Sequence, residues 1–307
     1  MSLETDLLLD RRRLKRRLVF WRIFAILALV VAALVGLRGT GLEPTGARIA
    51  RVSVDGLITE DRKLTEAIEA LAENSQVKAV ILAIDSPGGS VAGGETLHDA
   101  IARVATKKPV VVTMGGVAAS AGYMIAMPAS RIFAREATLT GSIGVLLETG
   151  EISGLLGKLG IGAEVIRSGP LKDEPSLVRP LSPAGQEVMQ GLVNDMYDQF
   201  VAMVAAGRHM DVAKVKSLAD GRPYTGRQAL GLGLVDAIGG EREAKEWLTS
   251  EKGVSADLPI QDISERSLAQ RALSGRLATI FQDILKMLVS QSLSLDGAWA
   301  VWLRSGR

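Results

Sequence analysis

Short apolar runs alternate with amphipathic stretches along most of this 307-residue chain. Short, mostly apolar runs bounded by turn-forming residues predict strands, and the amphipathic stretches between them predict helices. This alternation is typical of an α/β domain. The predicted strands are Arg48–Val54, Lys78–Ile84, Pro109–Met114, Arg131–Ala134, Ser142–Leu147 and Glu164–Arg167.

Helix starts are marked by capping residues. Ser182 followed by Pro183 predicts the N-terminus of a long helix that ends near Ala206. Thr225 and Asp211 are expected to cap two further helices.

One apolar run is too long for a strand. Residues 18–37 form a stretch of twenty residues that would span roughly 30 Å as a helix, the thickness of a bilayer core. Its one charge, Arg22, lies near the basic end, from which the guanidinium can reach the headgroups. Six of the seven residues 11–17 are basic, whereas Arg38 alone follows closely. The positive-inside rule then predicts a single-pass anchor in the cytoplasmic (inner) membrane, with the N-terminus cytoplasmic and the rest outside.

Two other interpretations of this run are weaker. A cleaved signal peptide would be shorter and would end in a small-x-small site, which the sequence lacks. A buried core helix would not be flanked by so basic a tail.

The predicted organisation is a cytoplasmic tail (1–17), an anchor (18–38), a linker (39–47), an α/β domain (48–250) and a helical extension (251–307). The extension carries an apolar stripe that could cover its own domain, another subunit or a membrane surface, and the sequence leaves these alternatives open. The stripe consists of Leu273, Leu277, Ile280, Phe281, Ile284 and Leu288.

The amino-acid composition restricts the kinds of binding and catalysis that this chain can carry out. The net charge is only +2 and its positive part is local, which indicates a membrane flank and not a nucleic-acid groove. The absence of cysteine excludes disulfides, thiol nucleophiles and thiolate metal sites. The two histidines, His98 and His209, fall inside an amphipathic helix and at a helix end, where surface and capping roles suffice.

Two glycine-containing segments are candidates for a site. The turn 85–90 reads Asp-Ser-Pro-Gly-Gly-Ser between a strand and a helix, the position where open α/β sheets bind ligands. Ser120 lies among small residues at the opening of another helix, where a peptide carbonyl could reach its hydroxyl and the amide of Ala121. Each feature alone is more simply a chain reversal or a helix cap. A serine nucleophile also needs a base, and with no persuasive histidine the remaining common base is a lysine whose charged form is disfavoured by burial.

Several short motifs occur in a fixed order along the chain, and as an ordered set they are specific where each alone is weak. They are the segments 85–89 (DSPGG), 118–123 (AASAGY), 140–145 (TGSIGV), 168–173 (SGPLKD), 179–183 (RPLSP), 220–226 (DGRPYTG) and 232–236 (LGLVD). With these motifs, the chain from about Ile49 to Trp247 resembles the SppA family of signal peptide peptidases, which have the ClpP/crotonase-like fold.

The resemblance implies a set of roles. It makes Ser120 the nucleophile, Lys172 the general base and Ser142 the residue that orients the lysine, with the amides of Gly88 and Ala121 as the oxyanion hole. It implies a serine endopeptidase that degrades remnant signal peptides and other short or unfolded peptides without cofactor or metal. Many relatives carry Gly-Gly-Tyr-Tyr after the serine where this chain has Ala-Gly-Tyr-Met, which affects the expected substrate preference more than catalysis.

Two rival functions and one assembly follow from the same residues. A crotonase-type acyl-CoA enzyme would use a similar pair of amides, and a catalytically silent membrane scaffold would only bind peptides. The family also includes longer members with two tandem domains, whereas this chain has room for one. Because Lys172 lies 52 residues after Ser120 in a Gly/Pro-bearing loop, we expect a homo-oligomeric ring in which Lys172 of one subunit serves Ser120 of its neighbour.

Overall fold

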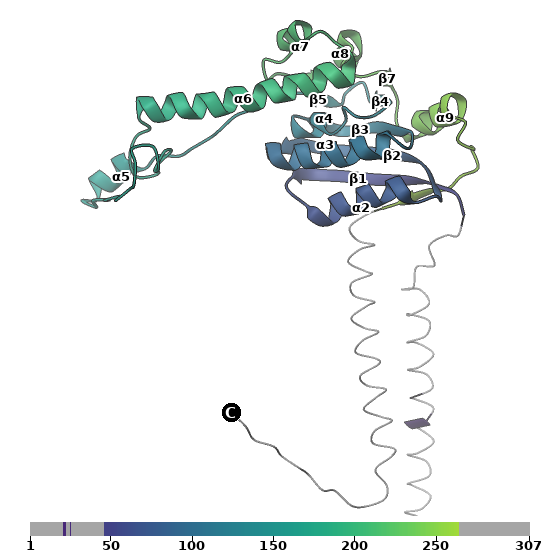
Figure 1. Ribbon diagram of the computed structural model, residues 1–307, viewed down its shortest axis with the longest axis horizontal. Coiled ribbons are helices and arrows are strands. Elements are labelled where there is room, and N and C mark those ends of the chain that lie inside the picture. The colour runs from purple at the N-terminus through teal and green to yellow at the C-terminus, as the bar shows by residue number, and fades with distance from the viewer. Residues whose placement is uncertain (1–20, 23–24, 26–45, 264–307) are drawn as a thin grey trace, which may run out of the picture. The chain divides into compact units, whose positions relative to one another are not determined.

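A twisted eight-stranded sheet forms the centre of the unit that spans residues 46–263 (Figure 1). The computed structural model describes residues 21, 22, 25 and 46–263. The sheet order is β6-β5-β3-β2-β1-β8, with β4 paired to β3 and β7 paired to β4. All pairings are parallel except the antiparallel pairing of β5 with β6. The strands are β1 (Arg48–Ile58), β2 (Val77–Gly89), β3 (Val110–Ala119), β4 (Arg131–Ala134), β5 (Leu139–Gly141), β6 (Pro223–Thr225), β7 (Ala237–Ile238) and β8 (Ile260–Asp262).

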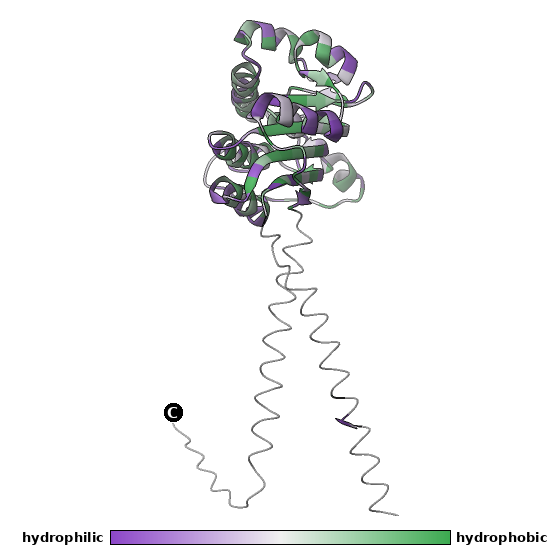
Figure 2. Cartoon of the chain, turned by 90° about the vertical axis from the view of Figure 1, so that its right-hand side faces the viewer, coloured by the Kyte–Doolittle hydropathy of each residue, from purple (hydrophilic) through white to green (hydrophobic). Residues whose placement is uncertain are grey.

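Helices cover both faces of this sheet, and the predicted α/β domain is confirmed. Helices α2, α3, α4 and α6 contribute to the larger core, whereas α9 packs on the other face. In Figure 2 the strands are predominantly hydrophobic and the helices carry hydrophilic residues on their outer sides. The helices are α2 (Arg62–Glu73), α3 (Val91–Ala105), α4 (Ala121–Met124), α5 (Ser153–Lys158), α6 (Pro183–Arg208), α7 (Val212–Leu218), α8 (Gly226–Leu232) and α9 (Glu241–Lys252).

Strand β2 shows why this sequence needs helices on both sides. Its side chains alternate between the faces, so Val80 and Leu82 enter the core under α2 and α3, while Ala79 and Ile81 enter the core under α9. Because both sets are apolar, the strand reads as a continuous hydrophobic run, as expected for a parallel strand that is buried on both faces.

The sequence located most of the elements but misplaced two strands. The N-caps Ser182, Asp211 and Thr225 are confirmed, and α6 continues to Arg208. The strand predicted over 142–147 is wrong, because positive φ angles at Gly141 and Ser142 turn the chain out of the sheet immediately after β5. The strand predicted over 164–167 is also wrong, since this exposed segment has no neighbouring strand to pair with.

Strand β8 extends the sheet beyond residue 250, the predicted end of the domain, by pairing with β1. The apolar stripe of the extension lies outside the described residues, as does the predicted membrane span apart from residues 21, 22 and 25. Within the described part of the chain, no helix has both the length and the apolar character to cross a membrane.

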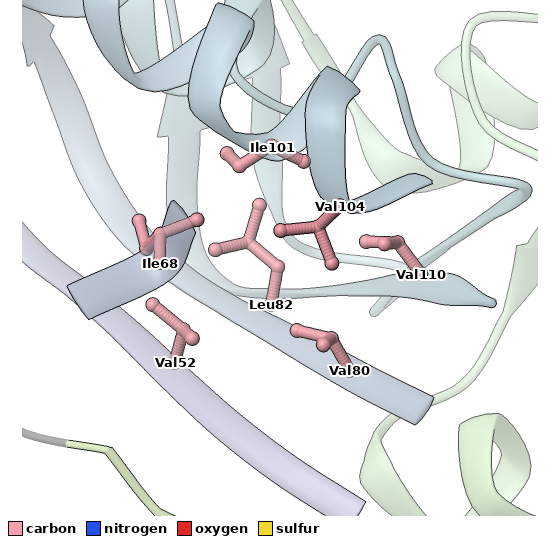
Figure 3. Close-up of a pocket in the computed structure, with 7 residues that line it drawn as sticks. All are labelled: Val52, Ile68, Val80, Leu82, Ile101, Val104 and Val110. Carbon is pink, nitrogen blue, oxygen red and sulfur yellow. The ribbon is translucent and has the colours of Figure 1, made fainter. Parts of the chain in front are cut away.

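A cavity of about 10 Å³ lies in the larger core, between α2, α3 and the sheet (Figure 3). Its lining is entirely aliphatic, so it offers no hydrogen-bonding partner to a water molecule. We interpret it as a packing gap and not as a substrate site. The lining residues are Val52, Ile68, Val80, Leu82, Ile101, Val104 and Val110.

A largely buried ion pair joins the end of α6 to the segment before β7. Both terminal nitrogens of Arg208 bind the carboxylate of Asp236, at 2.6 and 3.1 Å, and Arg208 Nε donates to the Gly233 carbonyl. Asp236 also accepts a hydrogen bond from the Ile132 amide, which ties β4 into the same network. The segment Leu-Gly-Leu-Val-Asp at 232–236 therefore holds a structural junction.

We expect Arg208→Ala to lower the free energy of unfolding by about 2 to 3 kcal/mol, because it leaves Asp236 largely buried without its cation. Urea denaturation monitored by circular dichroism measures this change. The matched control is Arg227→Ala, which removes an exposed ion pair with Glu136 and should cost less than about 1 kcal/mol. Equal losses in the two variants would contradict a special role for the buried pair.

Candidate active site

The predicted nucleophile, Ser120, lies at the sharp turn between β3 and α4. Its backbone has φ 54° and ψ −123°, a conformation that non-glycine residues rarely adopt and that persists only when the surroundings enforce it. Its amide donates to the Gly141 carbonyl at 2.9 Å, and its carbonyl accepts the amides of Tyr123 and Met124. The neighbouring strand and the following helix thus hold Ser120 from both sides.

A change of partner along β3 directs this turn. The first half of β3 pairs with β4 and its last residues pair with β5, and the change falls at Gly115 and Gly116. The Asp85 carboxylate occupies this site, where it accepts the Val117 amide at 3.0 Å. A Cβ atom on Gly115 would lie 3.0 Å from the Asp85 carboxyl carbon, so the strand can pass closely only because this residue is glycine.

The turn 85–90 meets Ser120 directly. Gly88 has φ +113°, and a Cβ atom on it would lie 2.8 Å from Ser120 Cβ and 3.2 Å from the Ala121 nitrogen. The Ala121 amide is the first of α4, where amides have no acceptor within the helix. The Gly88 amide, in contrast, donates to the buried Ser86 hydroxyl at 3.1 Å. The backbones of Gly88 and Ala121 are therefore adjacent to the serine, with the Gly88 amide directed to Ser86.

Ser142 follows the residue that binds the Ser120 amide, so it lies on the same side of the sheet end. Its φ is 48°, its amide donates to the Arg222 carbonyl, and its hydroxyl donates to the Gly221 carbonyl at 3.1 Å. The segment Asp-Gly-Arg-Pro-Tyr-Thr-Gly at 220–226 thus supports Ser142 from the neighbouring β6 edge, and a lysine is not among the partners of this hydroxyl.

Helix α4 is anchored beneath the nucleophile by Tyr123. This side chain is fully buried and its hydroxyl donates to the Leu234 carbonyl at 2.7 Å. Burial raises the pKa of Tyr123 well above its ordinary value, so it remains a neutral donor at all working pH values. It fixes the helix start that presents Ser120.

Lys172 is the one predicted site residue that the fold does not bring to Ser120. It is exposed, in a turn closed by a hydrogen bond from its own amide to the Gly169 carbonyl. This turn belongs to residues 145–181, here called the arm, which also contains α5. Figure 1 shows α5 at one end of α6, away from the sheet end that carries α4. Glu174, two residues after Lys172, lies against Gly185 in the first turn of α6, whereas Gly207 in the last turn of this helix lies against Met127, which closely follows α4. Within one subunit the described structure thus groups Ser120, Gly88, Ala121 and Ser142 and leaves Lys172 near the opposite end of α6.

Several supporting residues carry no prediction of their own from the sequence. Asp85 and Ser86 were visible only as parts of a turn motif, and Thr140 only as a residue beside Ser142. The Thr140 hydroxyl is buried and donates to the Ala118 carbonyl at 2.7 Å, which connects the last residues of β3 to β5. In the sequence, these residues could have been found only because they lie within the ordered motifs. Their supporting roles became clear from the hydrogen bonds that they make in the structure.

The histidines agree with the roles expected from the sequence. His98 lies on α3 beside Asp99, and His209 caps the C-terminus of α6 in a left-handed conformation. Over residues 46–263, no three His, Asp or Glu side chains gather closely enough to hold a metal ion.

Comparison with known proteins gives the class of this chain. The model of peptidase family S49 matches residues 102–255 and the model of Clp protease matches residues 52–140. The S49 match covers half of the chain, which therefore belongs to peptidase family S49 and is a serine peptidase of the SppA type.

The relatives differ in length. A protein of Synechocystis sp. named as a protease is 40% identical over 75% of this chain and 84% of its own length. An Enterococcus faecium protein named as a signal peptide peptidase SppA is 38% identical over 67% of this chain and 64% of that protein. The chloroplastic serine protease SPPA of Arabidopsis thaliana is 37% identical over 82% of this chain, but this chain spans only 36% of it.

Among solved structures, ClpP1 of Listeria monocytogenes matches at a TM-score of 0.43 and 20% identity over 63% of this chain and 92% of that chain. A membrane-bound stomatin-specific protease matches at a TM-score of 0.47 and 15% identity, over 72% of this chain and 99% of that chain.

Proposed function

We propose that this serine peptidase cuts peptides with Ser120 as nucleophile and Lys172 as general base. The observation that carries the proposal is the setting of Ser120, at a positive φ angle in direct contact with the Gly88 backbone and the first amide of α4. A serine held in this way presents its hydroxyl beside backbone amides that can bind a developing oxyanion.

The reaction proceeds in two halves. The uncharged Lys172 amine takes the Ser120 proton while the hydroxyl oxygen attacks the peptide carbonyl carbon. The carbonyl oxygen becomes an oxyanion that accepts hydrogen bonds from the amides of Ala121 and Gly88. The Gly88 amide must first break its hydrogen bond to the Ser86 hydroxyl. The lysine ammonium then protonates the leaving amine, which frees an acyl-enzyme. Water, deprotonated by the same amine, attacks the ester carbon, and the lysine ammonium returns the proton to the Ser120 oxygen as this oxygen leaves and the new carboxyl end is released.

The dyad is proposed to form between neighbouring subunits. Lys172 lies on the arm, away from its own nucleophile, and the arm exposes apolar side chains that a second copy of the chain would cover. Each copy places its arm against the next, a head-to-tail contact that closes into a ring when the rotation allows. The most exposed of these apolar residues are Leu146, Leu155, Leu159, Ile161, Ile166 and Leu177.

The proposed substrates are remnant signal peptides and other short or unfolded peptides. A ring that encloses its sites restricts entry to extended chains, and the name of the enterococcal relative describes signal peptide cleavage. The proposed location is the outer side of the cytoplasmic membrane, held there by residues 18–37.

A serine-reactive fluorophosphonate probe tests the function. We expect it to label the wild-type protein and to leave Ser120→Ala unlabelled, with the adduct on the peptide that contains residue 120. An unlabelled wild-type protein that binds peptides would favour the silent scaffold instead, and binding of CoA by the purified protein would favour the crotonase-type enzyme.

A reporter fused after Arg307 tests the membrane topology. Because the basic residues precede the apolar run, we expect alkaline phosphatase at this position to be active outside the cytoplasm, and the protein to stay in the membrane fraction after a salt wash. An active β-galactosidase fusion at the same position would overturn the topology.

A further inference from the structure

The arm has almost no hydrophobic core of its own. Between residues 145 and 181 the structure buries only polar groups, Ser176 and the side chain of Glu174, and leaves most of the apolar side chains exposed. A segment with so little apolar burial needs other contacts to hold one conformation. The conformation of the Lys172 turn therefore depends on polar contacts.

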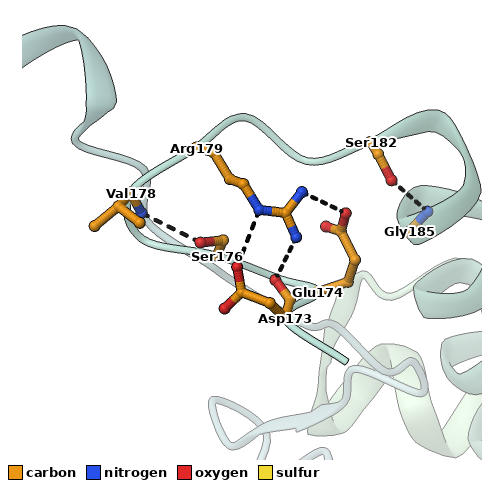
Figure 4. A network of polar contacts seen from close by, with 7 residues as sticks. All are labelled: Asp173, Glu174, Ser176, Val178, Arg179, Ser182 and Gly185. Carbon is orange, nitrogen blue, oxygen red and sulfur yellow. Dashed lines mark hydrogen bonds and ion pairs between the residues drawn. The ribbon is translucent and has the colours of Figure 1, made fainter. Parts of the chain in front are cut away.

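Those contacts converge on Arg179 (Figure 4). Arg179 Nε donates to the Asp173 carboxylate at 3.0 Å, Nη2 donates to the Asp173 carbonyl at 3.0 Å, and Nη1 donates to the Glu174 carboxylate at 3.1 Å. Asp173 and Glu174 directly follow Lys172 in the chain. One guanidinium thus fixes both the backbone and the side chains next to the lysine, with the fork geometry that arginine alone provides.

The same cluster is fastened to α6. The Glu174 side chain is 1% exposed and lies against Gly185, where a Cβ atom would come within 2.6 Å of the Glu174 carboxyl carbon. Ser182 caps the helix by accepting the Gly185 amide at 3.0 Å. A carboxylate in this position is favoured by the positive end of the 26-residue helix. The Lys172 turn is therefore connected to the first turn of α6 through Glu174.

Both carboxylates are held in their charged form. The hydrogen bond from Arg179 lowers the pKa of Asp173, and a hydrogen bond from Ser182 lowers the pKa of Glu174 against the opposing effect of burial, with Arg179 adding to it. A lowered pKa means that the ion pairs persist at neutral pH and are lost only as the pH falls through the carboxylate range.

We infer that Arg179 is a positioning residue of the peptidase, which clamps Asp173 and Glu174 onto the start of α6 so that the Lys172 amine is presented at one fixed place. The inference rests on the proposed role of Lys172 as the base. It assigns to Arg179 an effect on turnover without contact to the substrate.

The test compares Arg179→Ala, Arg179→Lys and Lys172→Ala in the full-length protein. We expect Arg179→Ala to lower kcat about tenfold with little change in KM, as for loss of a group that orients a functional side chain.

Two further measurements separate positioning from general destabilisation. Hydrogen exchange of the amides in 169–179 should accelerate in Arg179→Ala, while the melting temperature of the protein stays within about 2 °C, since the arm adds little to the core. Arg179→Lys should recover part of kcat, because one ammonium can still bind one carboxylate. The matched control Lys216→Ala removes an exposed ion pair with Asp198 on α6 and should change none of these quantities.

Failure of the proposed base and failure of the positioning role of Arg179 give different results. If Lys172→Ala retains activity, the proposed base is wrong and the positioning role falls with it. If Lys172→Ala is inactive but Arg179→Ala keeps the wild-type kcat and the wild-type exchange rates in 169–179, the proposed base stands and the clamp is refuted. If Arg179→Ala does not fold, Arg179→Lys carries the test, and wild-type kcat together with wild-type exchange rates in that variant would refute the clamp.

Discussion

Peptide hydrolysis is expected to fall by about 1,000-fold or more in both Ser120→Ala and Lys172→Ala, with kcat/KM on an unfolded peptide substrate as the measurement. The first variant removes the attacking oxygen, and the second removes the only group proposed to take its proton. Neither change should disturb folding. Alanine keeps the Cβ atom at the strained Ser120 position, and Lys172 is exposed. Circular dichroism and the melting temperature check that both variants remain folded.

Matched substitutions give the controls for this pair. Ser130→Ala removes an exposed serine that follows α4, and Lys158→Ala removes an exposed lysine from α5 on the same arm. Both should keep activity within about twofold, because surface substitutions away from a site have small effects. Substantial turnover by folded Ser120→Ala or Lys172→Ala would refute the proposed dyad.

Mixing the two inactive variants should restore part of the activity. In a mixed ring, some interfaces combine an intact Ser120 from a Lys172→Ala subunit with an intact Lys172 from a Ser120→Ala subunit. Random mixing at equal amounts yields a complete pair at about one interface in four, so we expect activity of roughly a quarter of wild type. The variants are dissociated together, reassembled and assayed, with each variant treated alone as the control.

The readout of this experiment depends on showing that mixed assemblies exist. Different affinity tags on the two variants allow assemblies that contain both to be purified in sequence. Tagged mixtures that contain both variants and remain inactive would show that each subunit carries its own dyad. That result would refute sharing of Lys172 while leaving the dyad itself untouched.

The sequence was sufficient for features that depend on local order. The alternation of Val80, Leu82 and Ile84 with Ala79 and Ile81 predicts a strand, because side chains of a strand alternate between its faces. Cap residues located helix starts for the same reason, since a cap acts within its own turn. The ordered motifs also identified Ser120, Gly88, Ala121 and Ser142, which the structure brings together.

Features that depend on contacts between distant residues came only from the tertiary structure. The segment Glu164–Arg167, with Val165 and Ile166 at its centre, resembles a strand in sequence, but a strand needs a neighbour, and the described fold provides none there. The end of β5 was missed because the backbone reversal at Ser142 is stabilised by the Gly221 and Arg222 carbonyls, about 80 residues further along the chain.

In the candidate active site, too, some features follow from the sequence and others only from the tertiary structure. Sequence motifs determined which residue types are present, because the resemblance of each segment can be judged within a few positions. Only the fold decided that the Ser86 hydroxyl engages the Gly88 amide, that Arg179 binds both residues after Lys172, and that Lys172 lies apart from Ser120. Distances between side chains are set by how the elements pack against one another, and that packing is a property of the whole chain and not of any one segment.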